Sequence, residues 1–173
     1  MRKLTDDQTT MKILITIFLV TLSFGLFAQG KIVGHYRDYF GSRIQLNADS
    51  TFKYTWHFDL SGSWTKGTWS LNNDTVYFHM VPTYDTISHK NNDGTSADKL
   101  ILSDDETSER LTPEQYASMG LSSGGQNKQP YPDKLFSKRQ KLFAIKNGKL
   151  VTKKIKGFWS KKKWRPWFFK SDD

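Results

Sequence analysis

Histidines have the widest chemical repertoire in this sequence, because imidazole can bind a metal ion or transfer a proton near neutral pH. His57 and Asp59 alternate with other residues in one segment, so both side chains should leave the same face of a strand. His79 should also point outward, but an intervening strand would separate its backbone from that of His57 by about 10 Å. A zinc or copper site needs several convergent ligands. We therefore predict no metal site and interpret the histidines as solvent-facing; they are His35, His57, His79 and His89.

Other catalytic groups lack the spacing that catalysis requires. The chain has no cysteine, which excludes a thiolate nucleophile, a thiolate metal site and a disulfide framework. No serine lies in a Gly-x-Ser-x-Gly elbow, and there is no EF-hand spacing, phosphate-binding loop or Gly-x-Gly-x-x-Gly motif. The acidic run SDDETSE is typical of a solvated loop or at most a loose cation site. The sequence thus predicts a protein that is not an enzyme and needs no cofactor; the carboxylates considered are Asp59, Asp85, Asp104 and Asp105.

Aromatic residues are the more informative group, because they make up 14% of the chain and many fall in phase along short segments. In a small barrel, inward-facing rings either fill the interior or line a pocket for a small apolar ligand. A packed core without a cavity is an equally good interpretation, since a small core needs aromatic residues on its strands in any case. The residues predicted to face inward and contact such a ligand are Tyr36, Trp56, Trp64, Trp69 and Phe78.

Alternating segments would position these rings. In DSTFKYTWHFD, large aromatic residues occupy every second position, which indicates a strand with one buried face. Ile44 and Leu46 are in phase in the segment before it, and TVYFHMV repeats the pattern after it. Polar turns are expected at 48–50 and 72–74. Short strands separated by polar turns predict an antiparallel meander.

The middle of the chain is expected to be less regular. Residues 85–99 are polar and loop-like, and KLILS adds one short strand. LTPEQYASM is predicted to be a brief helix with Thr112 as N-cap, Pro113 at the first helical position and Gln115 completing a capping box. SSGGQNKQPYPD is too rich in Gly, Ser, Pro and Asn to be regular.

A closed barrel is the expected architecture. Asn147-Gly148 in KLFAIKNGKLVTKK is the strongest hairpin signal in the chain. About eight strands are counted, and closure of such a meander into an up-and-down barrel removes its exposed edges. The fold class is therefore predicted as all-β, a single antiparallel meander that closes into a roughly eight-stranded barrel with one short helix and a basic aromatic C-terminal tail. The counted strands lie near residues 31, 44, 54, 66, 77, 101, 142 and 152.

The order of these segments resembles a known group of proteins. GHYRDYFGSRIQLNADSTFKYTW, GSWTKGTW, NDTVYF and a late NGKLVTKK hairpin are similar to the small secreted bacterial lipocalin-like β-barrel proteins. They also resemble the N-terminal barrel of the copper-response outer-membrane lipoproteins, although this chain lacks the lipid-bearing Cys and the paired Cys of that barrel. The resemblance covers most of residues 32–156 and implies the barrel fold; no metal or signalling role is transferred from it.

The N-terminal segment predicts export. MKILITIFLVTLSFGLFAQG contains one basic residue, an apolar run and a small residue at Ala28, which is the order of a secretory signal peptide. The apolar run is shorter than the roughly twenty residues of a membrane-spanning helix, so an uncleaved anchor is the less favoured alternative. We expect a signal peptide over 1–28, with Met11 as the true start, a barrel domain over 29–157 and a tail over 158–173. A periplasmic or extracellular location follows.

Charge distinguishes the C-terminal third from the rest of the chain. Residues 128–173 hold fifteen Lys and Arg against three Asp, whereas the rest of the exported chain is mildly acidic. Interleaved basic and aromatic residues can bind nucleic acid, but export excludes that partner and leaves anionic lipid or polysaccharide. Barrel closure, with the lysines as a solvated face, is the competing interpretation. The residues predicted to contact an anionic surface are Trp159, Lys161, Lys162, Lys163, Trp164, Arg165 and Trp167.

Two functions therefore remain open from the sequence. The first is a secreted, lipocalin-like binding module that holds a small apolar molecule. The second is an envelope-associated interaction protein that docks on anionic lipid or polysaccharide through its tail. Neither the ligand nor the oligomeric state follows from the sequence.

Overall fold

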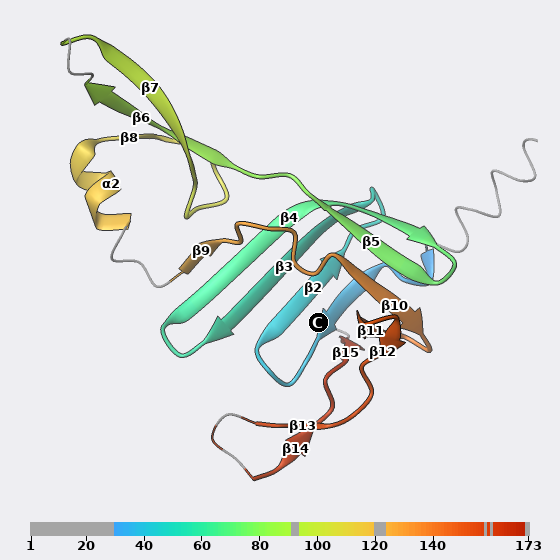
Figure 1. Cartoon of the computed structure of the whole chain (residues 1–173). Coiled ribbons are helices and arrows are strands. Elements are labelled where there is room, and N and C mark those ends of the chain that lie inside the picture. The colour runs from blue at the N-terminus through green and yellow to red at the C-terminus, as the bar shows by residue number, and fades with distance from the viewer. Residues whose placement is uncertain (1–29, 91–93, 120–123, 158, 160, 172–173) are drawn as a thin grey trace, which may run out of the picture. The chain divides into compact units, whose positions relative to one another are not determined.

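Eight antiparallel strands close into a barrel in the structure, a computed structural model (Figure 1). The structure describes residues 30–90, 94–119, 124–157, 159 and 161–171. Each barrel strand pairs with two neighbours, and the pairings of β10 with β11 and of β15 with β1 complete the ring. This confirms the predicted eight-stranded barrel. In order around the ring, the strands are β1 (Gly34–Arg37), β2 (Ser42–Leu46), β3 (Thr51–Phe58), β4 (Ser61–Asn72), β5 (Thr75–Met80), β10 (Lys134–Lys138), β11 (Lys141–Lys146) and β15 (Phe168–Ser171).

The strands β1 to β5 form a run of consecutive hairpins whose turns match the polar signals in the sequence. The turn at 48–50 joins β2 to β3, and the turn after Asn72 joins β4 to β5. Asn73 and Asp74 have φ values of 47° and 60°. Positive φ at both central residues is what a two-residue type I′ turn requires, and its twist matches that of the paired strands.

Every second side chain along these strands points inward and fills the core of the barrel. Phe52 and Tyr54 on β3 are 2% and 3% exposed, and Val76 on β5 is fully buried. The rings of Phe52 and Phe78 meet edge to face, with centroids 4.7 Å apart, although β4 lies between their strands. This contact identifies their shared face as the interior of the barrel.

The tight β1–β2 connection depends on Gly41, which has a φ of 88°. A Cβ on this residue would lie 2.1 Å from the backbone oxygen of His57. Gly148 also has a positive φ, 71°, but a Cβ there would meet nothing within 4 Å. Alanine at Gly148 therefore tests the cost of a left-handed backbone conformation alone, whereas alanine at Gly41 adds the cost of a steric clash.

We expect Gly41→Ala to lower the free energy of unfolding by about 2 kcal/mol, since it adds a backbone clash to a left-handed conformation. Gly148→Ala should cost only about 1 kcal/mol, because the left-handed conformation is its only penalty. Urea unfolding of both variants measures the difference. Equal losses of stability would show that the approach of Gly41 to His57 imposes no strain.

A separate outer hairpin interrupts the barrel between β5 and β10. The polar stretch 85–99 was expected to be a loop, but its residues contribute to β6 (Tyr84–Lys90) and β7 (Ser96–Leu102), which pair antiparallel. The expectation was wrong because both faces of β7 are largely exposed, so no hydrophobic alternation marks the strand. The short β8 (Arg110–Leu111) adds a third strand, parallel to β6.

The predicted helix is present as α2 (Pro113–Met119). Its capping box is formed in both directions: the Thr112 backbone N–H donates to Gln115 Oε1 at 2.8 Å, and the Gln115 N–H donates to Thr112 Oγ1 at 3.3 Å. The following segment is less irregular than expected, because β9 (Gly124–Gln126) runs parallel to β4. It occupies the edge of β4 that β5 leaves free beyond Met80.

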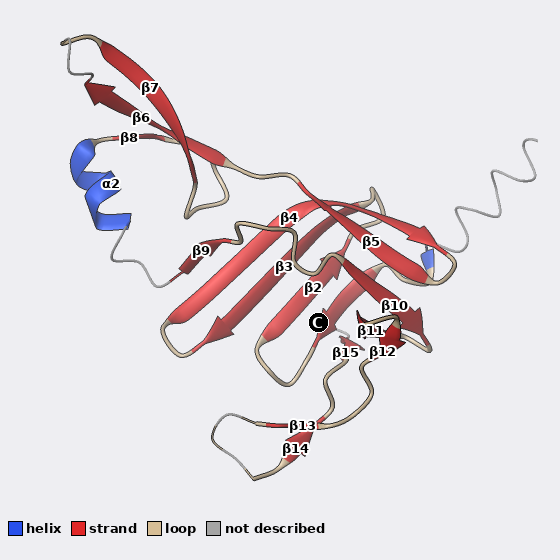
Figure 2. Ribbon diagram, viewed as in Figure 1, coloured by secondary structure: helices blue, strands red, loops and turns tan. Residues whose placement is uncertain are grey.

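The C-terminal segment includes a barrel strand. The Asn147-Gly148 turn leads from β11 into β12 (Lys149–Leu150), as the sequence predicts. A second small hairpin follows, of β13 (Ile155–Lys156) and β14 (Lys163–Trp164), and the chain then returns as β15 to pair with both β1 and β11. The barrel thus continues into residues 168–171, which the sequence analysis had assigned to a tail beyond residue 157. Strands make up most of the described chain (Figure 2).

Gly34–Asp173 forms one compact unit, and the described barrel lies within it. The signal peptide expected over 1–28 lies outside the described residues. None of the helices in the described part of the chain is long and apolar enough to cross a membrane.

Candidate functional site

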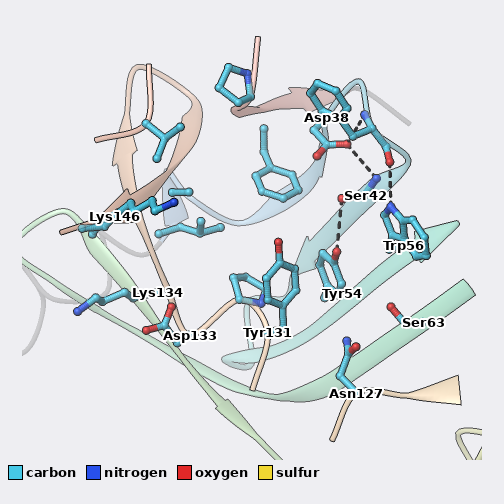
Figure 3. Close-up of a pocket in the computed structure, with 18 of the residues that line it drawn as sticks. Asp38, Ser42, Tyr54, Trp56, Ser63, Asn127, Tyr131, Asp133, Lys134 and Lys146 are labelled. Carbon is cyan, nitrogen blue, oxygen red and sulfur yellow. Dashed lines mark hydrogen bonds between the residues drawn. The ribbon is translucent and has the colours of Figure 1, made fainter. Parts of the chain in front are cut away.

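The interior of the barrel is packed at one end and hollow at the other. At the packed end, Leu46, Val76 and Leu142 are at most 1% exposed. At the other end, which we call the mouth, the wall encloses an open cavity of about 930 Å³ (Figure 3). The β1–β2 loop, the connected ends of β3 and β4, the segment 127–133 and the ends of β10, β11 and β15 meet there.

Aromatic rings form one wall of the cavity. Tyr54 and Trp56 alternate on β3 and point inward, and Tyr131 meets Tyr54 edge to face with ring centroids 5.1 Å apart. The Trp56 indole is fixed in place, because Nε1 donates a hydrogen bond of 2.9 Å to the backbone oxygen of Phe40. The rings therefore present a preformed apolar surface to a ligand.

Asp38 places a carboxylate beside the aromatic wall of the cavity. Its Oδ1 accepts two backbone hydrogen bonds, from the N–H groups of Phe40 at 2.8 Å and Ser42 at 2.9 Å. Both bonds use the same oxygen, and Oδ2 accepts no hydrogen bond from a described residue. One carboxylate oxygen thus organises the β1–β2 loop, while the other can accept a hydrogen bond from a ligand.

Two tyrosine hydroxyls lie close to this carboxylate. Burial raises the pKa of Tyr54, a hydrogen bond to Ser42 offsets part of this rise, and the Asp38 carboxylate adds to it. Burial and the Asp38 carboxylate also raise the pKa of Tyr131, whose hydroxyl points into the cavity although the residue as a whole is 57% exposed (Figure 3). Both hydroxyls therefore stay protonated at neutral pH. Tyr54 donates its proton to Ser42 Oγ at 3.4 Å, so the Tyr131 hydroxyl is the one that can donate to a ligand.

The segment 127–133 is held across the mouth by bonds to β4 and β5. Asn127 donates its backbone N–H to the Trp64 oxygen at 2.8 Å and its Nδ2 to Thr65 Oγ1 at 2.7 Å. At the other end of the segment, the Asp133 oxygen accepts the N–H of Phe78 at 2.9 Å. The segment that carries Tyr131 is therefore fixed at both of its ends, which keeps Tyr131 beside the cavity.

The opposite wall of the cavity is mainly aliphatic. Leu135 and Ala144 face each other in the register of β10 and β11 and both contribute to the lining. Lys146 continues the inward face of β11 at the rim (Figure 3). The cavity thus combines aromatic and aliphatic walls with a few polar groups near its opening, which is typical of sites for small organic molecules.

The structure brings only one of the five predicted ligand contacts into the cavity. Trp56 lines it, whereas Tyr36, Trp69 and Phe78 are 2%, 3% and 8% exposed and pack in the closed interior. Burial raises the pKa of Tyr36 to about 12. These side chains fill the core and leave the cavity to residues near the strand ends.

Trp64 corrects the sequence analysis, because it faces outward. Trp64 and Trp69 are five positions apart on a regularly paired strand, so they must lie on opposite faces. Trp64 is nevertheless only 8% exposed, since the loop after β7 covers it and the Asp104 oxygen accepts its Nε1–H at 2.8 Å. Lys53 of the same outer face forms an ion pair with Glu106, at 2.5 Å. Burial of this ring therefore fastens the outer hairpin to the barrel.

The predicted surface contacts divide into two groups. Trp164 and Trp167 are half-buried: Trp164 packs on Tyr39 with ring centroids 5.0 Å apart, and Trp167 packs on Phe143 at 5.4 Å. Trp159 is 90% exposed. The basic side chains are exposed as well; they are Lys161, Lys162, Lys163 and Arg165.

The histidine and carboxylate candidates do not converge. His57 and His79 are exposed on β3 and β5, with β4 between them. Asp104 lies in the loop after β7, where burial and the neighbouring charges of Asp105 and Asp85 raise its pKa. Within the described residues, no group of three or more His, Asp or Glu side chains is placed to hold a metal ion.

Sequence reasoning missed most of the cavity. Asp38, Asn127 and Tyr131 lie in loops, and no motif distinguishes them in the sequence. Only the strand alternation that marked Trp56 and Tyr54 signalled an inward position. Comparisons with known proteins find no family model that matches this chain, and no match among curated proteins or solved structures.

Proposed function

We propose that the protein is a binding module that holds a small, mainly apolar ligand in the mouth cavity. The observation that carries this proposal is the cavity of about 930 Å³ at one end of an otherwise packed barrel. Its size is in the range of small-molecule sites, roughly 300–1,000 Å³. A ligand that covers the apolar part of this open wall is stabilised there, because removing apolar surface from water is favourable.

The wall chemistry defines the ligand class. An apolar body fits between the Tyr54 and Trp56 side and the aliphatic side formed by Leu135 and Ala144. A hydroxyl at one end of the ligand can donate to Asp38 Oδ2 and accept from the Tyr131 hydroxyl, whereas an ammonium group can only donate to Asp38 Oδ2. The proposed ligand is therefore an amphiphile with a small polar head.

Binding without catalysis is the proposed role of these polar groups. Asp38 Oδ1, Trp56 Nε1 and Asn127 Nδ2 all bond to the cavity wall itself. Their observed bonds shape the mouth. Export to the periplasm or beyond is part of the proposal and depends on the apolar segment that starts at Met11.

Filling the cavity should abolish binding. We expect the neutral probe N-phenyl-1-naphthylamine to become strongly fluorescent on titration with the protein from Gln29 onward, which contains the whole barrel. Ala144→Trp should weaken this binding by about tenfold or more, since a tenfold loss requires only ~1.4 kcal/mol. Tyr77→Trp is the matched control, because Tyr77 is 44% exposed on the outside of β5.

Near-UV circular dichroism establishes that each variant is folded. Should Ala144→Trp perturb the fold, Ser63→Trp fills the cavity from the β4 side instead. The proposal fails if the folded, filled variant binds the probe as tightly as Tyr77→Trp does. It also fails if the unaltered protein gives no fluorescence increase.

A further inference from the structure

A small basic hairpin stands beside the cavity mouth. We call residues 153–165 the basic hairpin; it contains β13 and β14, in which Ile155 pairs with Trp164 and Lys156 with Lys163. The Gly157 N–H also donates to the Lys162 oxygen at 3.2 Å. This pairing holds the two arms of the hairpin together (Figure 1).

The hairpin is fastened to the mouth by its aromatic base. Tyr39, in the β1–β2 loop, packs on both Trp164 and Phe169, with ring centroids 5.0 Å and 5.2 Å away. Ile155 within the hairpin and Pro166, which directly follows it, line the cavity. A surface that contacts the hairpin therefore also lies next to the cavity opening.

The hairpin concentrates positive charge. No Asp or Glu occurs between Lys134 and Ser171 in the sequence, so the segment carries no acidic residue of its own. The cations of the hairpin are Lys153, Lys154, Lys156, Lys161, Lys162, Lys163 and Arg165. Their density creates a positive potential that attracts an anionic surface.

The hairpin also exposes apolar side chains among these charges. Trp159 is 90% exposed and Ile155 is 45% exposed. Lys162 lies over the ring of Trp164, with Nζ 4.3 Å from the ring centroid. An exposed indole in a lysine-rich segment matches the headgroup region of a membrane, where the ring enters the interface and the ammonium groups meet lipid phosphates. An acidic polysaccharide would use the charge but would give the exposed indole no apolar phase to enter.

We propose that the basic hairpin docks the barrel mouth on an anionic lipid bilayer. Each lysine or arginine near such a surface strengthens binding by roughly fivefold, and insertion of Trp159 adds an apolar contribution. Docking does not depend on the cavity ligand. One consequence does rest on the proposed function: an amphiphile could pass between the cavity and the lipid surface without crossing bulk water.

Vesicle flotation tests the docking. Protein from Gln29 onward is mixed with vesicles of phosphatidylcholine alone or of equal parts phosphatidylcholine and phosphatidylglycerol. We expect binding to the anionic vesicles only, weakened by added salt. The double variant Lys161→Ala with Lys163→Ala should bind at least about tenfold more weakly.

Two comparisons make this result specific. Lys99→Ala with Lys138→Ala removes the same charge from exposed positions outside the hairpin and should leave binding within about twofold. Trp159→Ala should weaken vesicle binding while leaving binding to soluble dextran sulfate unchanged. Ala144→Trp should bind vesicles normally, so a failure of the ligand proposal would not be mistaken for a failure of docking.

Several outcomes would overturn the proposal. If the Lys161→Ala, Lys163→Ala variant and the Lys99→Ala, Lys138→Ala variant lose equal vesicle affinity, net charge alone explains the binding. Equal binding to neutral vesicles would exclude an electrostatic contribution. Tight binding to dextran sulfate without vesicle binding would identify an acidic polysaccharide as the partner.

Discussion

Ending the chain after Gly157 is expected to abolish cooperative folding of the barrel. This truncation removes β15, which pairs with β1 on one side and β11 on the other. Both neighbours would become open edges with unpaired backbone groups. Phe168, only 8% exposed, would also be lost, and removal of one buried Phe side chain typically costs about 3–5 kcal/mol. Together these losses approach the whole stability of a small domain, about 5–15 kcal/mol.

The matched control shortens the basic hairpin and keeps β15. Ile155 and Trp164 are opposite each other in the β13–β14 register, so two glycines in place of Lys156–Lys163 can join them. This variant should show the near-UV circular dichroism and the cooperative urea transition of the unaltered protein. The truncated chain should show neither. A cooperative transition in the truncated chain would mean that β15 is dispensable and that the barrel tolerates an open seam.

Local signals made β3, α2 and the 147–148 turn predictable. Strict alternation on β3 required one buried face, and the capping residues Thr112 and Gln115 marked the start of α2. The Asn147-Gly148 turn was recognisable for the same reason, since few residues adopt positive φ at two successive positions. Each of these signals involves residues close together in the sequence.

Closure of the barrel was harder to see because it is non-local. β15 has four residues, no alternation of polar and apolar side chains, and a partner, β1, near the opposite end of the sequence. Two of the eight strands counted from the sequence, near residues 101 and 152, belong to hairpins outside the barrel, whereas β10 and β15 complete the ring. The number of strands was therefore right although two assignments were wrong.

The candidate site depends on the same non-local pairing. Its walls come from strand ends and loops that converge only after the barrel has closed, so Asp38 and Tyr131 carry no signature in the sequence. Trp64 shows the opposite error. Its size suggested a core position, but the parity of β4 placed it outside, under the Asp104 loop. Strand parity was readable from the sequence and would have excluded Trp64 as a partner of Trp69 inside the barrel.

Substitution of Asp38 tests which interactions stabilise the β1–β2 loop at the mouth of the cavity. We expect Asp38→Ala to lower the free energy of unfolding by about 2 to 4 kcal/mol, because the backbone N–H groups of Phe40 and Ser42 both lose their acceptor. Each such loss costs about 1–3 kcal/mol when the group is buried, and Ser42 is only 7% exposed. The loop that carries Tyr39 and Phe40 should loosen as a result, so probe binding should weaken as well.

Asp38→Asn separates the hydrogen bonds from the charge. The amide oxygen can still accept from both N–H groups, so this variant should lose less than about 1 kcal/mol in urea unfolding. If a ligand donates to Oδ2, Asp38→Asn should keep its stability but bind a ligand amine less tightly, because the carboxylate bond is the stronger one. A loss of stability as large as that of Asp38→Ala would contradict this account. It would show that the negative charge, and not the two backbone bonds, holds the mouth loop in place.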